Sequence, residues 1–214
     1  MVSYSAKVPE IDGVISKSEY YGAFENYGLL TYNTPFLSTR QGKCFAANDG
    51  TYLYLAMQSE VPDADSNVKL LKRFKKRDGA VMWDDNVEFL VTPPDGNAVY
   101  HMIINPADTV YDVKYPMENG GISFQKFVDW DPELKVKSVV DGKYWTVELR
   151  VPLKDLGYRT GTADETWHLQ FARSWQNPVE QCSYNVAAVF AEPGNMNPVL
   201  FTKKTPSAAF TGMG

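Results

Sequence analysis

Residues Lys43–Gln58 read KCFAANDGTYLYLAMQ, and this stretch predicts a β-hairpin. Apolar and aromatic residues fill both halves, and the tripeptide NDG at positions 48–50 separates them. Asp-Gly is a strong hairpin signal because these residues tolerate the positive φ angles of a type I′ turn. We therefore expect two antiparallel strands, Lys43–Ala47 and Thr51–Gln58, joined by this turn.

The same pattern of turn residues followed by β-branched and aromatic runs recurs along most of the chain. A second Asp-Gly pair at positions 141–142 predicts another hairpin. The count comes to about nine or ten strands. Besides the first hairpin, the expected strands are Asn86–Thr92, Val99–Ile104, Thr109–Val113, Leu134–Val140, Tyr144–Val151, Trp167–Ser174 and Pro198–Thr202.

One segment breaks the strand pattern and predicts a single short helix. Residues 66–77 read SNVKLLKRFKKR, with Val68, Leu71 and Phe74 at helical spacing and six basic residues. A Ser-Asn pair would cap the start, and a glycine follows the end. The charge fits either a solvated helix on a sheet edge or a surface that contacts an anionic polymer.

These elements predict an all-β fold, an antiparallel β-sandwich of immunoglobulin or jelly-roll type with one short helix. The 214 residues suit one domain, because sandwiches of this length often form a single unit. No internal repeat or linker divides the chain. We expect the domain at 1–204 and a flexible tail at 205–214, which reads TPSAAFTGMG.

Composition excludes several classes of function. The net charge of −5 argues against a general nucleic-acid binder, which needs a basic face to displace counterions. No apolar run reaches the 18 residues of a membrane span, so we expect no membrane insertion. Aromatic residues make up 14% of the chain, a share that suits β-sheets and also surfaces that stack flat apolar ligands. Cys44 and Cys182 could form one disulfide, but two cysteines do not decide the pairing.

The densest polar cluster reads WDDNVE at positions 83–88. Three carboxylates here fit a glycosidase acid/base pair, sugar hydrogen-bond acceptors or a structural calcium ion at Asp84 and Asp85. A glycosidase needs two carboxyls on opposite sides of the scissile bond, whereas neighbours on one strand need not bracket anything. Calcium favours several oxygen ligands, although no EF-hand spacing is present. No nucleophile–base motif, zinc motif or dinucleotide fingerprint appears, so we expect no enzyme and no required cofactor.

At these motifs the chain resembles the family 9 carbohydrate-binding modules. PEIDG at 9–13 is similar to the family's opening, although Tyr20 and Tyr21 stand where a Trp is usual. DGTYLYLA at 49–56, WDDNVEF at 83–89 and YHMIIN at 100–105 follow the family order. GKYWTVELRVP at 142–152, DLG at 155–157 and residues 167–173 continue it, so the resemblance covers about residues 8–203.

The resemblance implies non-catalytic binding of a sugar or glycan chain end between two aromatic rings. Trp83 would be the first ring, although Met82 stands at its usual place, and Phe190 the second, where a Trp is expected. His101 stands where binders carry an Arg. A shallow cleft would lie between the acidic strand and residues 185–195. The expected hydrogen-bond partners are Glu88, His101, Asn105, Arg173 and Gln176.

Two other functions stay open. Sandwiches of the wider group include haem-binding cytochrome domains with Met and His or Lys ligands; His101 and Met102 cannot share one iron, because neighbours on a strand face opposite sides. His168 is the other histidine. A structural or interaction module would need the same sandwich. The sequence contains no recognisable signal peptide. We expect an extracellular or cell-surface location, with other domains of a larger secreted protein as partners.

Overall fold

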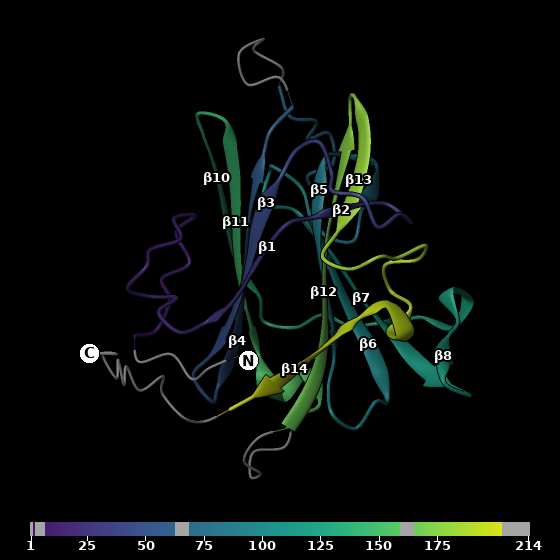
Figure 1. Ribbon diagram of the computed structural model, residues 1–214. Helices are drawn as coiled ribbons and strands as arrows, with labels where there is room; N and C mark the ends of the chain where they lie inside the picture. Colours follow the sequence, from purple (N-terminus) through teal and green to yellow (C-terminus); the bar gives the residue numbers. More distant parts are fainter. Residues whose placement is uncertain (1, 3–6, 63–68, 159–164, 203–214) are drawn as a thin grey trace.

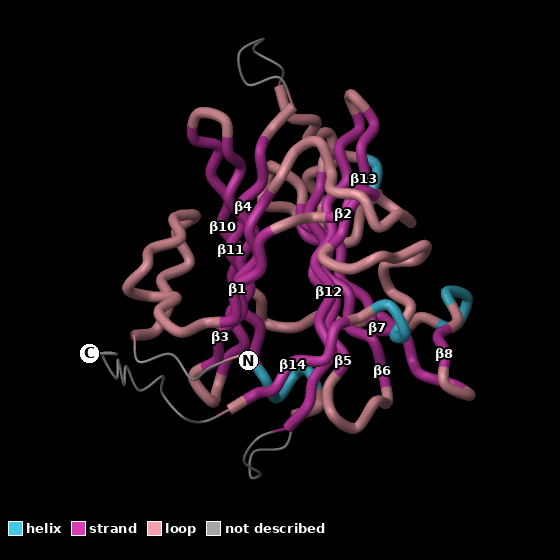
Figure 2. Tube along the Cα trace, viewed as in Figure 1, coloured by secondary structure: helices cyan, strands magenta, loops and turns pink. Residues whose placement is uncertain are grey.

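The structure is a computed structural model that describes residues 2, 7–62, 69–158 and 165–202. Two antiparallel sheets pack face to face (Figures 1 and 2), which confirms the predicted sandwich. The five-stranded sheet has the order β1-β3-β4-β11-β10. Its strands are β1 (Phe24–Tyr27), β3 (Gly42–Asn48), β4 (Tyr52–Glu60), β11 (Tyr144–Pro152) and β10 (Lys135–Asp141).

The nine-stranded sheet has the path β2-β13-β12-β5-β6-β7-β8. In addition, β14 (Asn197–Phe201) pairs with β12, and β9 (Val128–Asp129) pairs with β7. The strands of the path are β2 (Leu30–Thr31), β13 (Val179–Ser183), β12 (Glu165–Gln176), β5 (Asn86–Thr92), β6 (Ala98–Ile104), β7 (Val110–Glu118) and β8 (Gly121–Ile122).

The core lies between the two sheets and consists of alternate residues from each strand. Trp145 of β11 and Trp167 and Trp175 of β12 are fully buried there, with Phe89 and Phe171 packed edge to face at 5.6 Å between ring centroids. Each large apolar side chain buried in this way contributes about 1.5–3 kcal/mol to folding. The core therefore fixes which face of each strand points outward.

Both predicted hairpins are confirmed. β3 and β4 pair around residues 49–51, and β10 pairs with β11 around residues 142–143. Gly50 and Gly142 have φ angles of 82° and 56°, the left-handed region that the Asp-Gly signal anticipates. The predicted number of strands was too low, since the described residues form fourteen. The missed strands are β1, β2, β8, β9 and β13, most of them short.

The predicted helix at 66–77 is wrong. Residues 66–68 lie outside the described residues, and 69–77 form neither helix nor strand. The backbone N–H of Leu71 donates to Asp85 Oδ2 at 2.6 Å, and that of Phe74 donates to Asp84 Oδ2 at 2.9 Å. These carboxylates take the donors that a helix would use, so tertiary contacts override the helical spacing. The described helices are 3-10 turns: η2 (Val81–Trp83), η3 (Phe124–Lys126), η4 (Leu153–Leu156) and η5 (Pro193–Asn195).

None of these turns is long or apolar enough to cross a bilayer. The N-terminal segment covers part of the outer face of the five-stranded sheet, where Ile11 and Tyr20 pack on Phe45 and Tyr54. Glu148 of β11 holds this segment. Its carboxylate accepts hydrogen bonds from the Tyr20 hydroxyl and from the backbone N–H groups of residues 12–14 at 2.8–3.2 Å.

Candidate functional site

The outer face of the nine-stranded sheet carries three of the predicted site residues, Glu88, His101 and Phe190. On β5, Val87 and Phe89 point into the core, so Glu88 points outward by alternation. On β6, Met102 lies in the core and His101 points outward beside Glu88. The two side chains meet, with His101 Nε2 and Glu88 Oε2 2.8 Å apart. This pair forms the polar centre of the candidate site.

Trp83 lies in η2, which packs against the ends of β5, β6 and β7. Its side chain is 63% exposed, whereas Trp145, Trp167 and Trp175 have no exposed surface. The turn is fixed on both sides: the Trp83 N–H donates to the Ala80 carbonyl at 3.1 Å, and Arg73 donates to the Trp83 carbonyl. The sequence therefore places a large apolar ring in solvent on a rigid support.

The adjacent acidic residues organise the loops around Trp83. Asp84 accepts hydrogen bonds from Arg73 Nε at 3.1 Å, from the Phe74 N–H and from Asn105 Nδ2 at 2.9 Å. Burial alone would raise the pKa of Asp84, but these donors hold it below its usual value. Asp85 accepts from the N–H groups of Leu71 and Gln176, and burial raises its pKa.

Calcium at Asp84 and Asp85 stays a prediction. All four of their carboxylate oxygens already accept a hydrogen bond from protein donors. An ion would have to replace some of these donors. Within the described ranges, no group of three or more His, Cys, Asp or Glu side chains is arranged to hold a metal ion.

Phe190, the second predicted ring, is half-buried in the loop before η5. It packs against a cluster on the outer face that includes Leu90, Val99 and Met196. Tyr32 meets it edge to face, with 5.7 Å between ring centroids. The loop is tied to β12 because Gln170 Nε2 donates to the Asn195 carbonyl at 3.1 Å. Phe190 thus lies on the same outer face as Glu88 and His101.

Two further aromatic residues border the polar pair and were not predicted. Tyr115 of β7 lies beside His101, with 6.2 Å between ring centroids, and Phe124 of η3 packs edge-on against Tyr115 at 5.1 Å. Phe124 is 50% exposed. Tyr115 continues the outward alternation of β7, but the strand predicted from the sequence ends at Val113, two residues before it.

Two other predicted partners face the protein instead of the outer surface. Asn105 is fully buried, and its Nδ2 donates to the Phe74 carbonyl at 2.7 Å and to Asp84. Gln176 is half-buried and donates from Nε2 to the Asp84 carbonyl at 3.2 Å. Both residues support the loops that carry Trp83.

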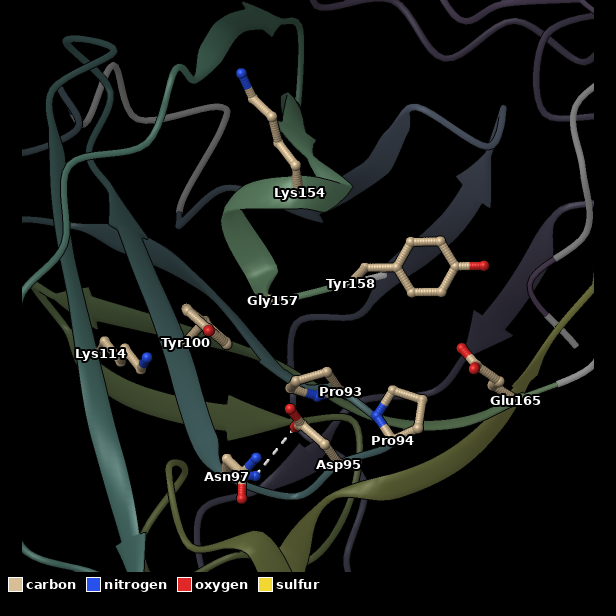
Figure 3. A pocket seen from close by; sticks show the side chains of 10 residues that line it. All are labelled: Pro93, Pro94, Asp95, Asn97, Tyr100, Lys114, Lys154, Gly157, Tyr158 and Glu165. Atoms are coloured by element: carbon tan, nitrogen blue, oxygen red, sulfur yellow. Dashed lines mark hydrogen bonds between the residues drawn. The ribbon is translucent and has the colours of Figure 1, made fainter. Parts of the chain in front are cut away.

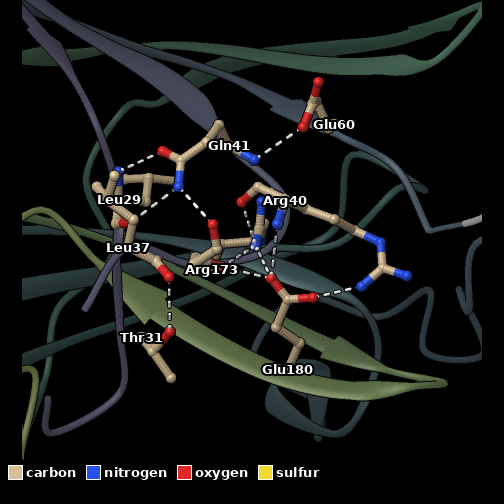
Figure 4. A network of polar contacts seen from close by, with 9 residues as sticks. Leu29, Thr31, Leu37, Arg40, Gln41, Glu60, Arg173 and Glu180 are labelled. Atoms are coloured by element: carbon tan, nitrogen blue, oxygen red, sulfur yellow. Dashed lines mark hydrogen bonds and ion pairs between the residues drawn. The ribbon is translucent and has the colours of Figure 1, made fainter.

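Arg173 is fully buried between the sheets, at the centre of the polar network in Figure 4. Its Nη2 donates to Glu180 Oε1 at 2.8 Å and to the Arg40 carbonyl at 3.1 Å. The guanidinium also lies over the Trp175 ring, 5.0 Å from its centroid. Burial would raise the pKa of Glu180, but Ser38 and the two arginines hold it below its usual value. Arg173 therefore lies on the opposite face of the sheet from Glu88.

The two cysteines and the two histidines lie in different parts of the fold. Cys44 and Cys182 are free thiols buried in the core, and burial raises the pKa of Cys182 to about 11. His101 points outward while Met102 is buried, so these neighbours face opposite sides as predicted. His168 is half-buried on β12. His101 and Met102 therefore cannot both ligate one haem iron.

A cavity of about 650 Å³ lies elsewhere, beyond the end of β5 at Thr92 (Figure 3). Tyr100 and Tyr158 line it together with Pro93 and Pro94, and Lys114 and Lys154 add positive charge. The Lys114 ammonium lies 5.4 Å from the centroid of the Tyr100 ring. Its lining contains none of the predicted site residues.

Neither a protein-family model nor a curated protein matches the sequence. Solved structures do match. A candidate carbohydrate-binding protein from Bacteroides uniformis ATCC 8492 aligns over 94% of this chain and 98% of its own, with a TM-score of 0.71 and 15% identity. A family 9 carbohydrate-binding module from Caldicellulosiruptor kristjanssonii, in complex with cellotriose, covers 100% and 97%, with a TM-score of 0.63 and 13% identity.

A second structure of a family 9 module from that organism, in complex with glucose, covers 99% of this chain and 99% of its own. Its TM-score is 0.61 and its sequence identity is 12%. Matches over nearly the whole of both chains confirm the predicted resemblance at the level of the fold. This chain therefore has the β-sandwich fold of the family 9 carbohydrate-binding modules.

Proposed function

We propose that this chain is a non-catalytic carbohydrate-binding module that stacks a sugar ring on Trp83. The exposed indole is the observation that carries the proposal, because large apolar side chains are normally buried. Three other tryptophans of this chain are fully buried. A sugar offers a flat C–H face that packs on such a ring, and stacking of flat ligands on aromatic side chains contributes about 1–3 kcal/mol per ring.

The Glu88–His101 pair would bind the sugar hydroxyls. The carboxylate of Glu88 has oxygens that accept hydrogen bonds from hydroxyl groups. The side chains of His101 and Glu88 keep 9% and 10% of their surface exposed, and a ligand would contact them through this exposed part. His101 Nδ1 lies below the surface without a partner among the described residues and is not one of these contacts. Phe190 and Tyr32 would border the same ligand from the loop side. Fold similarity to modules solved with cellotriose and glucose supports the proposal.

A non-catalytic role follows from the way the carboxylates are used. Asp84 and Asp85 accept hydrogen bonds from backbone and side-chain donors of neighbouring loops, and Glu88 lies beside His101. In the proposed site, Glu88 is the carboxylate left for the ligand, whereas glycoside hydrolysis ordinarily needs two carboxyls flanking the bond. The site would therefore hold a sugar without cleaving it.

A glycan array probed with the pure protein tests the proposal, followed by titration of the bound glycan with Glu88→Gln. We expect selective glycan binding, and a loss of about tenfold for the variant, because hydrogen bonds to charged groups contribute about 1.5–3 kcal/mol. Glu25→Gln, an exposed carboxylate on the other sheet, is the matched control and should bind normally. Binding to no glycan, or steady release of reducing ends by the wild-type protein, would refute the proposal.

A further inference from the structure

Six basic residues crowd residues 69–77, although the chain carries a net charge of −5. We call this stretch the basic segment. It forms neither helix nor strand and is held by its backbone, through the Leu71 and Phe74 N–H groups. Leu71 and Phe74 are half-buried, and the basic side chains on either side of them face solvent or the segment's acidic neighbours. Its basic residues are Lys69, Lys72, Arg73, Lys75, Lys76 and Arg77.

The two arginines of the basic segment are neutralised, but the four lysines are not. Arg73 pairs with Asp84 at 3.1 Å, and Arg77 pairs with Asp112 at 2.8 Å and Asp131 at 2.7 Å. The four lysines are all exposed, and none forms an ion pair with another described residue. Four positive charges therefore lie together in solvent without a partner on the described surface.

These charges lie next to the proposed sugar site. Arg73 Nη2 donates to the Trp83 carbonyl, and the Phe74 N–H donates to Asp84, the residue after Trp83. The basic segment thus runs along η2. Lys72 and Lys75 are direct neighbours of these two anchored residues.

A hollow of about 370 Å³ lies at the far end of the basic segment. Lys75 and Arg77 line it together with Asp108 and with Val136 of β10. Because Arg77 is paired with aspartates, the lysines carry the free positive charge of the segment. Lysine side chains are mobile point charges suited to anionic groups along a chain.

We infer that the ligand of the Trp83 site is an acidic glycan, whose carboxylate or sulfate groups lie against Lys69, Lys72, Lys75 and Lys76. The inference rests on the proposed function and names its ligand class. A neutral glycan would gain nothing from four clustered lysines, whereas an acidic one gains attraction and faster association. A glycan is favoured over a nucleic acid because the chain shares its fold with modules solved with cellotriose and glucose.

The test compares four probes by titration at 50 and 300 mM NaCl: hexagalacturonate, a sulfated galactan hexasaccharide, cellohexaose and a single-stranded oligonucleotide. The variant is Lys72→Gln/Lys75→Gln/Lys76→Gln. The matched control is Lys17→Gln/Lys135→Gln/Lys154→Gln, which removes the same charge from exposed lysines elsewhere. We expect an acidic glycan to bind more tightly than cellohexaose, with an affinity that falls as salt rises. The variant should lose about tenfold and the control little.

The two acidic probes decide whether carboxylate or sulfate is preferred. Equal affinity for acidic and neutral glycans, or equal losses in variant and control, would overturn the inference and leave sugar binding intact. Tighter binding of the oligonucleotide than of either acidic glycan would also overturn it. A protein that binds none of the glycans, here or on an array, would instead refute the proposed function.

Discussion

Residue type alone does not decide whether a side chain is buried, and the tryptophans of this chain show why. Trp145, Trp167 and Trp175 occupy inward positions of long strands and have no exposed surface. Trp83 lies in a 3-10 turn before β5 and is 63% exposed. The exposure of Trp83 follows from the position of η2. The carboxylate of Asp84 holds this turn against the neighbouring loops.

Arg173 shows what strand alternation can reveal about a single residue. It shares its parity along β12 with Trp167, Leu169 and Phe171, all of which are core residues. The sequence therefore held the signal that Arg173 points inward, but the family resemblance favoured a ligand-binding role. Glu88 and His101 stand next to core residues along their strands, so strand alternation predicts that both point outward.

Arg173→Gln should destabilise the protein by about 3 kcal/mol, because removing one partner of a buried ion pair leaves the other uncompensated. Arg40 still pairs with Glu180, so the loss should fall at the lower end of the usual range. Urea denaturation measures the change. Arg150→Gln, which removes an arginine stacked on Tyr52, should cost less than about 1 kcal/mol. Equal losses in the two variants would show that the buried network contributes little.

At the scale of elements, sequence signals predicted the structure correctly where the turn residues themselves determine the backbone conformation. The Asp-Gly turns predicted both hairpins, because the φ angles they require are a property of two residues. The helix at 66–77 failed because its backbone donors find acceptors far along the chain, in Asp84 and Asp85. Spacing within a twelve-residue window carries no information about such acceptors. The short strand β9 was missed for a related reason, since its partners Val113 and Lys114 lie well before it in the sequence. The short strand β8 pairs locally with the end of β7, across the turn at Asn119 and Gly120.

Asp84→Ala should loosen the basic segment and destabilise the fold by about 1–3 kcal/mol, because it removes the acceptor of buried donors. Asp84 is fully buried and accepts from Arg73, Phe74 and Asn105. Thermal unfolding measures the loss, and hydrogen exchange should show faster exchange at the Phe74 amide. Asp95→Ala, at an exposed turn, is the control and should change little. A stable Asp84→Ala protein with a protected Phe74 amide would show that the acidic turn does not hold this segment.

At the scale of the whole molecule, the outer faces of the two sheets differ in what lies on them. The N-terminal segment covers part of the five-stranded sheet, and Glu148 ties it down through four hydrogen bonds. The nine-stranded sheet carries Glu88, His101 and Phe190 on its outer face. The sandwich itself was predictable from alternating strands and turns. The arrangement of loops over each outer face was not, because it depends on contacts between segments that lie far apart in sequence.

Glu148 makes the stability of the molecule depend on pH. Burial raises its pKa to about 7 from an ordinary value of 4.5. The folded protein therefore keeps this proton to higher pH than the unfolded chain does. Its contribution to stability is complete below pH 4.5 and is lost as pH rises through 7. We expect the melting temperature to fall between pH 5.5 and 8, with a smaller fall in Glu148→Gln. An identical pH dependence in both proteins would contradict this assignment.

Calorimetric titration of Trp83→Ala with a glycan selected on the array tests whether the exposed indole binds the sugar. We expect the binding free energy to weaken by about 1–3 kcal/mol, or roughly 5- to 150-fold in affinity. Unfolding free energy should change by less than about 0.5 kcal/mol, as for surface substitutions, and not by the roughly 3–5 kcal/mol of a core aromatic. Tyr21→Ala, an aromatic residue 56% exposed on the N-terminal segment, should bind normally. Unchanged affinity in Trp83→Ala, or global unfolding of that variant, would show that the indole of Trp83 does not stack on the sugar.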